Sequence, residues 1–139
     1  MSSIFTRIIN GEIPGRIVWR DRVCVAMVDI RPLNRGHVLV IPIEEVDRWT
    51  DLLPDTASHC MTVAHTIGRA QQELFAPLRV GLIIAGFEVP HAHLHVVPID
   101  TMDHLNFVNA NPDADPDDLD RVAELLRQAL RRAGHEAVT

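Results

Sequence analysis

Three histidines alternate with apolar residues in the run HAHLHVVP, residues 91–98. Successive side chains of a β-strand point to opposite faces, so this spacing places His91, His93 and His95 together on one face. The apolar residues between them fall on the other face, where they can pack under a helix. A fold that contains this run must therefore hold a strand with one apolar face and one face of imidazoles.

The remaining apolar patterns predict four more strands. Short runs rich in β-forming residues, bounded by turn residues, occupy residues 17–19, 23–29, 37–42 and 79–85, and the histidine run gives a fifth strand at 92–99. The run HVLVIP at 37–42 is almost wholly apolar, which indicates burial on both faces.

Two main helices are expected. Residues 54–75 keep an apolar period close to that of an α-helix after the start signal Pro54-Asp55. Residues 116–133 follow a plausible N-cap, Asp115, with Pro116 at the first helical position and Gly134 at the exit. A helical turn at 4–9 and a short helix at 45–52 complete the pattern. Because the early strands have short connections, we predict an α+β fold with a five-stranded, largely antiparallel sheet.

Length and charge narrow the class of protein. We expect 139 residues to form a single domain, 1–139. A net charge of −6 without a basic stretch argues against a nucleic-acid partner. The sequence shows no signal peptide and no apolar run that would span a membrane, so a cytoplasmic location is expected. Cys24 and Cys60 are expected to be reduced core thiols, and the lack of a CxxC pair argues against a cysteine-based zinc site.

The histidine run itself is open to three interpretations. It can be a hydrogen-bonded histidine face without chemistry. It can be part of a metal site, but three histidines on a straight strand span roughly 13 Å, so a ligand such as His37 or Glu88 would be needed. It can also hold a nucleophile: a neutral histidine with one nitrogen fixed by a hydrogen bond forms covalent intermediates, and its neighbours stabilise charge on a phosphoryl oxygen. In that case the middle residue, His93, is the natural nucleophile.

HAHLHVVP resembles the HxHxH signature of the histidine-triad (HIT) family of nucleotide hydrolases and transferases. The stretch IFTRIINGEIPGRIVWRDRVCVAMVDIRPLNRGHVLVIP also resembles that family's opening segment. The two segments stand in the right order, and together the resemblance covers about residues 4–105. It implies the family's fold of a five-stranded antiparallel sheet with two helices, and a homodimer, as in many relatives.

The resemblance also implies roles for individual residues. The family's middle histidine attacks the α-phosphate of a nucleotide and becomes a nucleotidyl-histidine, which corresponds to His93. The flanking histidines of the triad orient it and contact phosphate, and a fourth histidine supports them. Asp29 corresponds to the carboxylate that holds the ribose hydroxyls, although a strand-end turn carboxylate is the plainer alternative. The flanking histidines correspond to His91 and His95, and the fourth histidine corresponds to His37. The positions that enclose the base correspond to Ile30, Phe5, Ile4, Ile8 and Ile13. Ile8 and Ile13 are also compatible with ordinary core.

The chain departs from the family pattern just before the triad. Relatives usually carry Asn before the glycine and Ser or Gln before the first histidine, whereas this chain reads IIAGFEVPHAHLH. A side-chain donor is lost and a carboxylate, Glu88, is gained. Glu88 can repel a second phosphate, act as a general acid if burial raises its pKa, or pair with an arginine at the rim. Arg31 and Arg35 are candidate phosphate contacts, or simply solvated.

The resemblance therefore implies a nucleotide hydrolase or, as the less favoured class, a nucleotidyl transferase, which acts at the α-phosphate of a purine (adenosine) nucleotide conjugate through a nucleotidyl-histidine intermediate. Neither a metal nor another cofactor is required in this mechanism. Two alternatives remain open: a nucleotide-binding module with weak or no catalysis, and a metal-dependent hydrolase.

Overall fold

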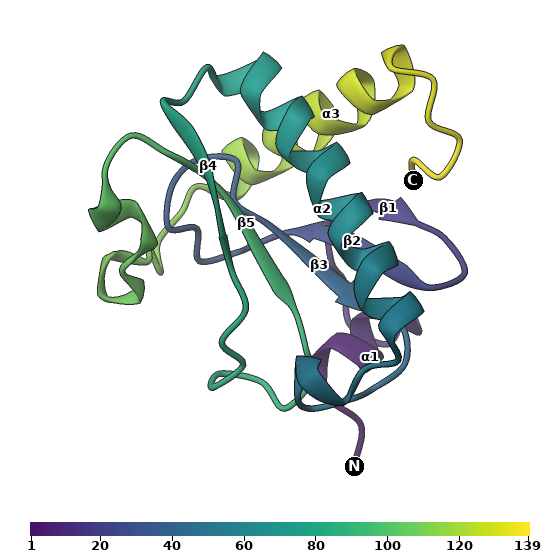
Figure 1. The fold of residues 1–139 in the computed structure, drawn as a ribbon. Coiled ribbons are helices and arrows are strands. Elements are labelled where there is room, and N and C mark those ends of the chain that lie inside the picture. The colour runs from purple at the N-terminus through teal and green to yellow at the C-terminus, as the bar shows by residue number, and fades with distance from the viewer.

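The five predicted strands form one antiparallel sheet in the computed structural model, which describes residues 1–139 (Figure 1). The strand order across the sheet is β1-β2-β3-β5-β4, and each neighbouring pair is antiparallel. The predicted α+β fold is thus confirmed. The strands are β1 (Ile17–Arg20), β2 (Cys24–Val28), β3 (Val38–Pro42), β4 (Arg79–Ile83) and β5 (Leu94–Ile99).

The two predicted long helices, α2 (Pro54–Phe75) and α3 (Pro116–Arg132), cover one face of the sheet. α3 begins as its sequence predicts, because the Asp115 side chain accepts a hydrogen bond from the backbone N–H of Asp117 and Pro116 is the first helical residue. The largest apolar cluster lies between these helices and the sheet. We call this side of the sheet the helix face. None of the helices is both long enough and apolar enough to cross a membrane.

The opposite face of the sheet is covered only in part. The short helix α1 (Ile4–Ile9) packs its buried residues Phe5 and Ile9 against inward side chains of β2 and β3. Two short 3₁₀ helices, η2 (Met102–Leu105) and η3 (Phe107–Asn109), follow β5. Every residue of the central strand β3 is buried, as the run HVLVIP predicts. This second side, which we call the open face, leaves room for a ligand.

The predicted helix at 45–52 is wrong. Only a single 3₁₀ turn, η1 (Trp49–Asp51), forms there. The Glu45 side chain accepts a hydrogen bond from the backbone N–H of Ser3, and the Val46 carbonyl accepts one from the N–H of Ala92. These contacts with distant segments replace the helical bonds that the local pattern favours.

The histidine run is only partly a strand. β5 begins at Leu94, two residues later than predicted, so His91 and His93 lie in the bend that leads into it. The rings of His93 and His95 have centroids 4.8 Å apart. The two rings therefore pack edge to face on the open face.

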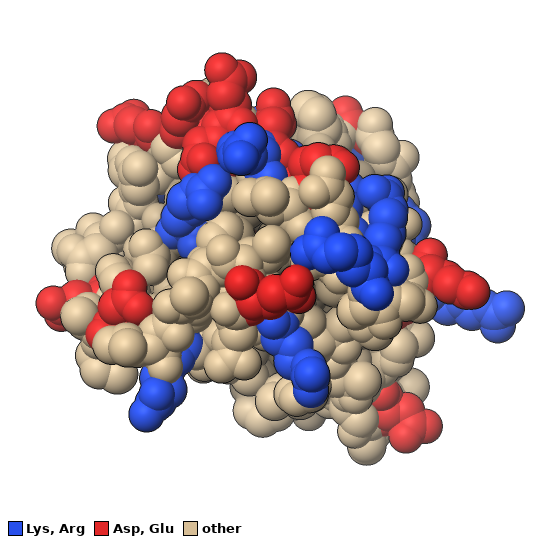
Figure 2. All heavy atoms as spheres, turned by 90° about the horizontal axis from the view of Figure 1, so that it is seen from above, with Lys and Arg blue, Asp and Glu red and all other residues tan.

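Acidic side chains gather at the start of α3, and Figure 2 shows them at one edge of the molecule with arginines beside them. Arg35 donates three hydrogen bonds to the two carboxylate oxygens of Asp118, at 2.8 to 3.0 Å. Arg16 pairs with Asp120 at 2.7 Å. Arg35, a candidate for phosphate binding, is thus engaged by a carboxylate.

Candidate active site

Two adjoining hollows on the open face bring the predicted site residues together. One, of about 500 Å³, is largely apolar and is walled by α1 and β2. The other, of about 430 Å³, reaches the histidines and Glu88. Ile4, Phe5, Asp29 and Leu39 line both hollows. The predicted base-enclosing residues all line the first hollow: Ile4, Phe5, Ile8, Ile13 and Ile30.

His93 has one ring nitrogen fixed and one free. Its Nδ1 lies 2.7 Å from the backbone carbonyl oxygen of His91. A carbonyl oxygen only accepts, so Nδ1 carries the proton and donates it to this bond. In the neutral ring, Nε2 of His93 then holds an unprotonated lone pair. This is the form that attacks an electrophile.

The tautomer of His95 is set through His37. The backbone N–H of Leu33 donates to Nδ1 of His37 at 2.9 Å, so the His37 proton is on Nε2. Nε2 of His37 lies 3.0 Å from Nδ1 of His95, which must accept the bond. The His95 proton is therefore on Nε2. That buried Nε2–H has no hydrogen-bond partner, which makes it a donor available to a ligand in the hollow.

His91 uses both of its ring nitrogens inside the protein. Its Nε2 donates to the Pro42 carbonyl at 2.7 Å, and its Nδ1 accepts from the Ser3 hydroxyl at 2.6 Å. The side chain is completely buried. No ring nitrogen of His91 is left for a phosphate, so its role is to hold His93 through its backbone carbonyl.

Burial keeps His37, His91 and His95 neutral near pH 7. Burial, together with the neighbouring histidines, lowers the pKa of His37 to about 3. Burial and His93 lower the pKa of His95 to about 4. Burial also lowers the pKa of His91. The hydrogen-bond directions given above for these neutral rings therefore hold at physiological pH.

Asp29 lies at the end of β2, where the two hollows meet. Its Oδ1 accepts a hydrogen bond from the backbone N–H of Arg31 at 2.8 Å, and its Oδ2 lies 3.5 Å from Nε2 of His37. Burial is the main influence on this carboxyl and raises its pKa. Asp29 is thus both the turn carboxylate of the plain interpretation and an acceptor that faces the hollow.

Glu88 lies close to the ring nitrogens of His93 and His95 at the second hollow. Its carboxylate oxygens lie 3.8 Å from Nε2 of His93 and 3.7 Å from Nε2 of His95. Its side chain is 44% exposed. No arginine pairs with it among the ion pairs of the structure. A negative charge therefore lies at the mouth of the hollow, where a phosphate would approach.

Two groups on the open face have metal-binding chemistry, and both include His95. Ligand atoms of Glu88, His93 and His95 lie within 4.8 Å of one another, as do those of Asp29, His37 and His95. However, the bond from His37 places the His95 proton on Nε2, the nitrogen that faces the hollow. A metal at that nitrogen would move the proton to Nδ1, where it would oppose the N–H of His37. This hydrogen bond thus disfavours a metal ion on Nε2 of His95.

Several supporting residues were not predicted from the sequence. Ser3 holds His91, and the Phe107 ring packs edge-on to His95 with centroids 4.9 Å apart. Gln71 of α2, fully buried, donates to the carbonyls of Gly36 and Val96, the neighbours of His37 and His95 in the chain. Ser3 stands at N-cap spacing before Thr6, and Gln71 is polar on an apolar helix face, so each left a sequence signal.

Comparison with known proteins agrees with this geometry. The HIT domain family model matches residues 10–102. An uncharacterised HIT-like protein of Mycobacterium tuberculosis is 31% identical over 135 residues, which cover 94% of each chain. Adenosine 5′-monophosphoramidase of Schizosaccharomyces pombe is 30% identical over 99 residues, which cover 70% of this chain and 74% of that one.

A solved structure gives the same result for the fold. The crystal structure of a zinc-bound histidine triad family protein from Mycobacterium smegmatis superimposes with a TM-score of 0.81 at 34% identity, over 96% of each chain. The family model, the sequence relatives and the shared fold all agree with the triad geometry. The chain belongs to the HIT domain family.

Proposed function

We propose that this protein hydrolyses a purine nucleotide conjugate, with adenosine as the favoured nucleoside, at its α-phosphate through a nucleotidyl-histidine intermediate on His93. One observation carries the proposal. The bond from Nδ1 of His93 to the His91 carbonyl leaves Nε2 with a free lone pair that faces the hollow. A supporting or purely structural histidine has no need of this arrangement.

The reaction divides into two displacements. In the first, Nε2 of His93 attacks the α-phosphorus, an N–P bond forms, and the bond to the leaving group breaks as that group departs with a proton taken from solvent. In the second, water attacks the phosphorus, the N–P bond breaks, the proton of the water returns to solvent, and the nucleoside monophosphate is released. The unpartnered Nε2–H of His95 is placed to donate to a phosphoryl oxygen in both steps. No metal or other cofactor takes part.

The apolar hollow beside α1 suits a nucleoside. A flat base is enclosed by Phe5 and the isoleucines, while Asp29 at the junction of the hollows accepts from the ribose hydroxyls. The phosphate then lies against His93 and His95. Arg31 lines the same hollow and is a further phosphate contact. The name of the fission-yeast relative, an adenosine 5′-monophosphoramidase, supports both the nucleoside and the bond that is cleaved.

Trapping the intermediate tests the proposal. The protein is mixed with an adenosine phosphoramidate, quenched rapidly without acid, and measured by intact-mass spectrometry. Wild type is expected to gain one adenylyl group, and His93→Ala is expected to gain none and to lose turnover while still binding AMP. His65→Ala, which replaces an exposed histidine of α2, is the matched control and should form the adduct normally.

Other results favour the alternatives. AMP binding without an adduct in wild type would favour a nucleotide-binding module. Loss of turnover on chelation, together with metal in the purified protein that the His95→Ala variant lacks, would favour a metal-dependent hydrolase. Normal turnover by His93→Ala would exclude the proposed nucleophile.

We also propose that the protein is a homodimer. β4 is an edge strand of the sheet, with unpaired backbone groups that can pair with a second copy. Leu82 on this strand and Met61 on the neighbouring helix are exposed and line one shallow hollow of about 330 Å³. Light scattering coupled to size exclusion gives the mass directly, and Leu82→Arg should reduce it to that of a monomer.

A further inference from the structure

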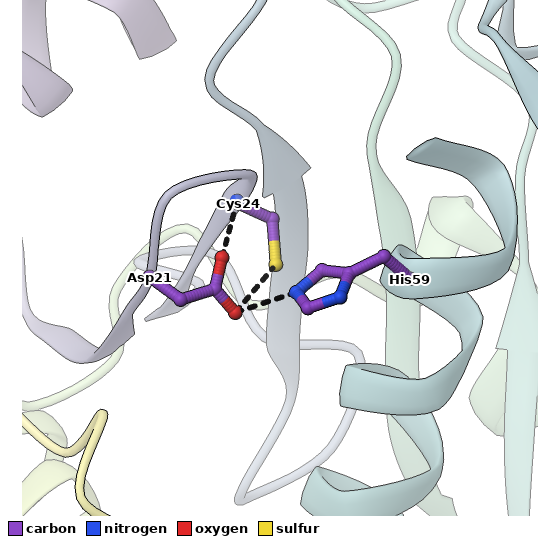
Figure 3. A group of neighbouring side chains, drawn as sticks. All are labelled: Asp21, Cys24 and His59. Carbon is purple, nitrogen blue, oxygen red and sulfur yellow. Dashed lines mark hydrogen bonds and ion pairs between the residues drawn. The ribbon is translucent and has the colours of Figure 1, made fainter. Parts of the chain in front are cut away.

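A second group of chemically active side chains lies on the helix face of the sheet. Asp21 precedes β2, Cys24 is the first residue of β2, and His59 lies in the first half of α2 (Figure 3). Their ligand atoms, a carboxylate oxygen, a thiol sulfur and an imidazole nitrogen, lie within 4.8 Å of one another. Cys24 packs in the cluster under α2 and α3, so the sheet separates this group from the triad on the open face.

The carboxylate of Asp21 is held firmly. Its Oδ1 accepts hydrogen bonds from the backbone N–H groups of Val23 and Cys24, both at 2.8 Å. Its Oδ2 accepts from the Trp19 indole at 2.9 Å. The same Oδ2 lies 2.6 Å from Nε2 of His59 and 3.9 Å from Sγ of Cys24. One oxygen thus fixes the turn, and the other faces the imidazole and the thiol.

We propose that Oδ2 of Asp21, Sγ of Cys24 and Nε2 of His59 bind a zinc ion. Tetrahedral zinc with ordinary bond lengths separates sulfur and oxygen ligands by about 3.6 Å, and nitrogen and oxygen ligands by about 3.4 Å. The sulfur is already 3.9 Å from Oδ2, and the imidazole must move away from Oδ2 by less than about 1 Å. His59 can do so because its side chain is 38% exposed.

The exposed side of the group leaves a path for the ion. Asp21 is 20% exposed and His59 38%, whereas Cys24 is fully buried, so zinc enters from the imidazole side and water completes its coordination there. The hydrogen bond with Cys60, together with burial, raises the pKa of the Cys24 thiol, so the metal-free site keeps this proton. Zinc displaces it, and one thiolate and one carboxylate then balance the charge of the ion.

Such a site would join two parts of the fold. Asp21 lies in the connection between β1 and β2, Cys24 begins β2, and His59 belongs to α2. A shared ion would tie the helix to this turn and stabilise the folded state by linkage. The proposal does not depend on the reaction assigned to His93, because the two groups lie on opposite faces of the sheet. The ligands come from two segments that are distant in the sequence. A search for a local motif such as a CxxC pair therefore could not find them.

The absorption spectrum of bound Co²⁺ distinguishes a metal ion at this site from one at the triad. The chain has only two cysteines, Cys24 and Cys60, and both are away from the open face. A thiolate-to-cobalt charge-transfer band can therefore arise only on the helix face, where both cysteines lie, and not from the triad. Reduced, metal-free, full-length protein titrated with Co²⁺ is expected to show this band at one equivalent, and Zn²⁺ should abolish it. Zn²⁺ should also raise the unfolding temperature.

Three variants make the test specific. Cys24→Ser should lose the band, and His59→Ala should weaken Co²⁺ binding by more than roughly tenfold, because even second-shell losses cost that much. His65→Ala, an exposed histidine on the same helix, should behave as wild type. A band that is missing in wild type, or that persists in Cys24→Ser, would overturn the proposal. If Cys24→Ser does not fold, an unchanged Co²⁺ affinity in His59→Ala overturns it instead.

Discussion

Nε2 of His37 lies 3.0 Å from Nδ1 of His95, and through this contact a backbone N–H determines which nitrogen of His95 carries the proton. The backbone N–H of Leu33 can only donate, so it fixes the His37 proton on Nε2. His37 then fixes the His95 proton on its Nε2, toward the hollow. The protonation of Nε2 of His95, the proposed hydrogen-bond donor to phosphate, is therefore set by a backbone amide two hydrogen bonds away.

The His37→Gln variant should disturb this relay without removing any group that touches substrate. We expect kcat to fall by roughly tenfold to a hundredfold, as for other orienting partners of a reactive group, with KM changed less than about threefold. The His95 ring should also show mixed tautomers by ¹⁵N NMR, a signal that simple destabilisation would not produce. His65→Gln serves as the control. An unchanged His95 spectrum would show that the relay does not operate.

The sheet and the two long helices were predictable because their patterns are local. Strand runs such as HVLVIP and the capped helix after Asp115 contain their own start and stop signals, and the structure follows them within one or two residues. The expected helix at 45–52 failed because Glu45 and Val46 bond to Ser3 and Ala92, which lie far away in the sequence. No local pattern encodes such contacts.

In the candidate site, too, local patterns were predictable and contacts between distant segments were not. The resemblance to the family named the residues that line the hollows, but it did not reveal which nitrogen of each histidine is free. That depends on contacts such as the one between Ser3 and His91, 88 positions apart. The assignment of His91 as a phosphate contact fails for this reason, since both of its nitrogens are already occupied.

Buried neutral histidines should make stability depend on pH. In the unfolded chain histidine titrates near pH 6.5, whereas in the folded protein the pKa is about 3 for His37 and about 4 for His95. Between these values the unfolded chain binds protons that the folded protein does not, so the free energy of unfolding falls as the pH falls. The loss should begin below about pH 6.5 and amount to several kcal/mol by about pH 4.

Urea unfolding at a series of pH values measures this effect. Asp21, whose hydrogen bonds lower its pKa to about 2 despite burial, adds a further loss only below about pH 3.8. The two contributions therefore overlap only between about pH 3.8 and pH 3. His37→Gln should make the fall between about pH 6.5 and pH 4 shallower. An equally steep fall in that variant would mean that His37 is not one of the groups responsible.

Ser3→Ala should destabilise the protein by two mechanisms. The Ser3 hydroxyl caps α1 by accepting from the backbone N–H of Thr6, and it donates to Nδ1 of buried His91. Loss of a cap costs about 1 kcal/mol, and an unsatisfied buried acceptor about 1–3 kcal/mol more. Ser2→Ala, the exposed neighbour, should cost almost nothing. Equal midpoints of urea unfolding for the two variants would contradict this role.

Asp29→Asn should reveal the ribose contact. If Oδ2 accepts from ribose hydroxyls, AMP binding should weaken by roughly tenfold or more, because a hydrogen bond to a charged group contributes about 1.5–3 kcal/mol. The 2′,3′-dideoxy analogue of AMP lacks those hydroxyls and should bind wild type and variant alike. Isothermal titration of both ligands to both proteins gives the comparison. Equal weakening for the two ligands would instead assign Asp29 to the turn alone.

Glu88→Gln should remove the electrostatic repulsion between the Glu88 carboxylate and substrates that carry more than one phosphate. The carboxylate lies 3.8 Å from Nε2 of His93, where it repels additional negative charge on a substrate. We expect KM for a dinucleoside polyphosphate to fall several-fold, and KM for an adenosine phosphoramidate, whose amine leaving group carries no phosphate charge, to change little. The difference should shrink at high salt, because Glu88 is 44% exposed and its field is screened. Glu44→Gln, another exposed carboxylate, is the control. Equal changes for both substrates would show that Glu88 acts on the reaction itself rather than on the charge of the leaving group.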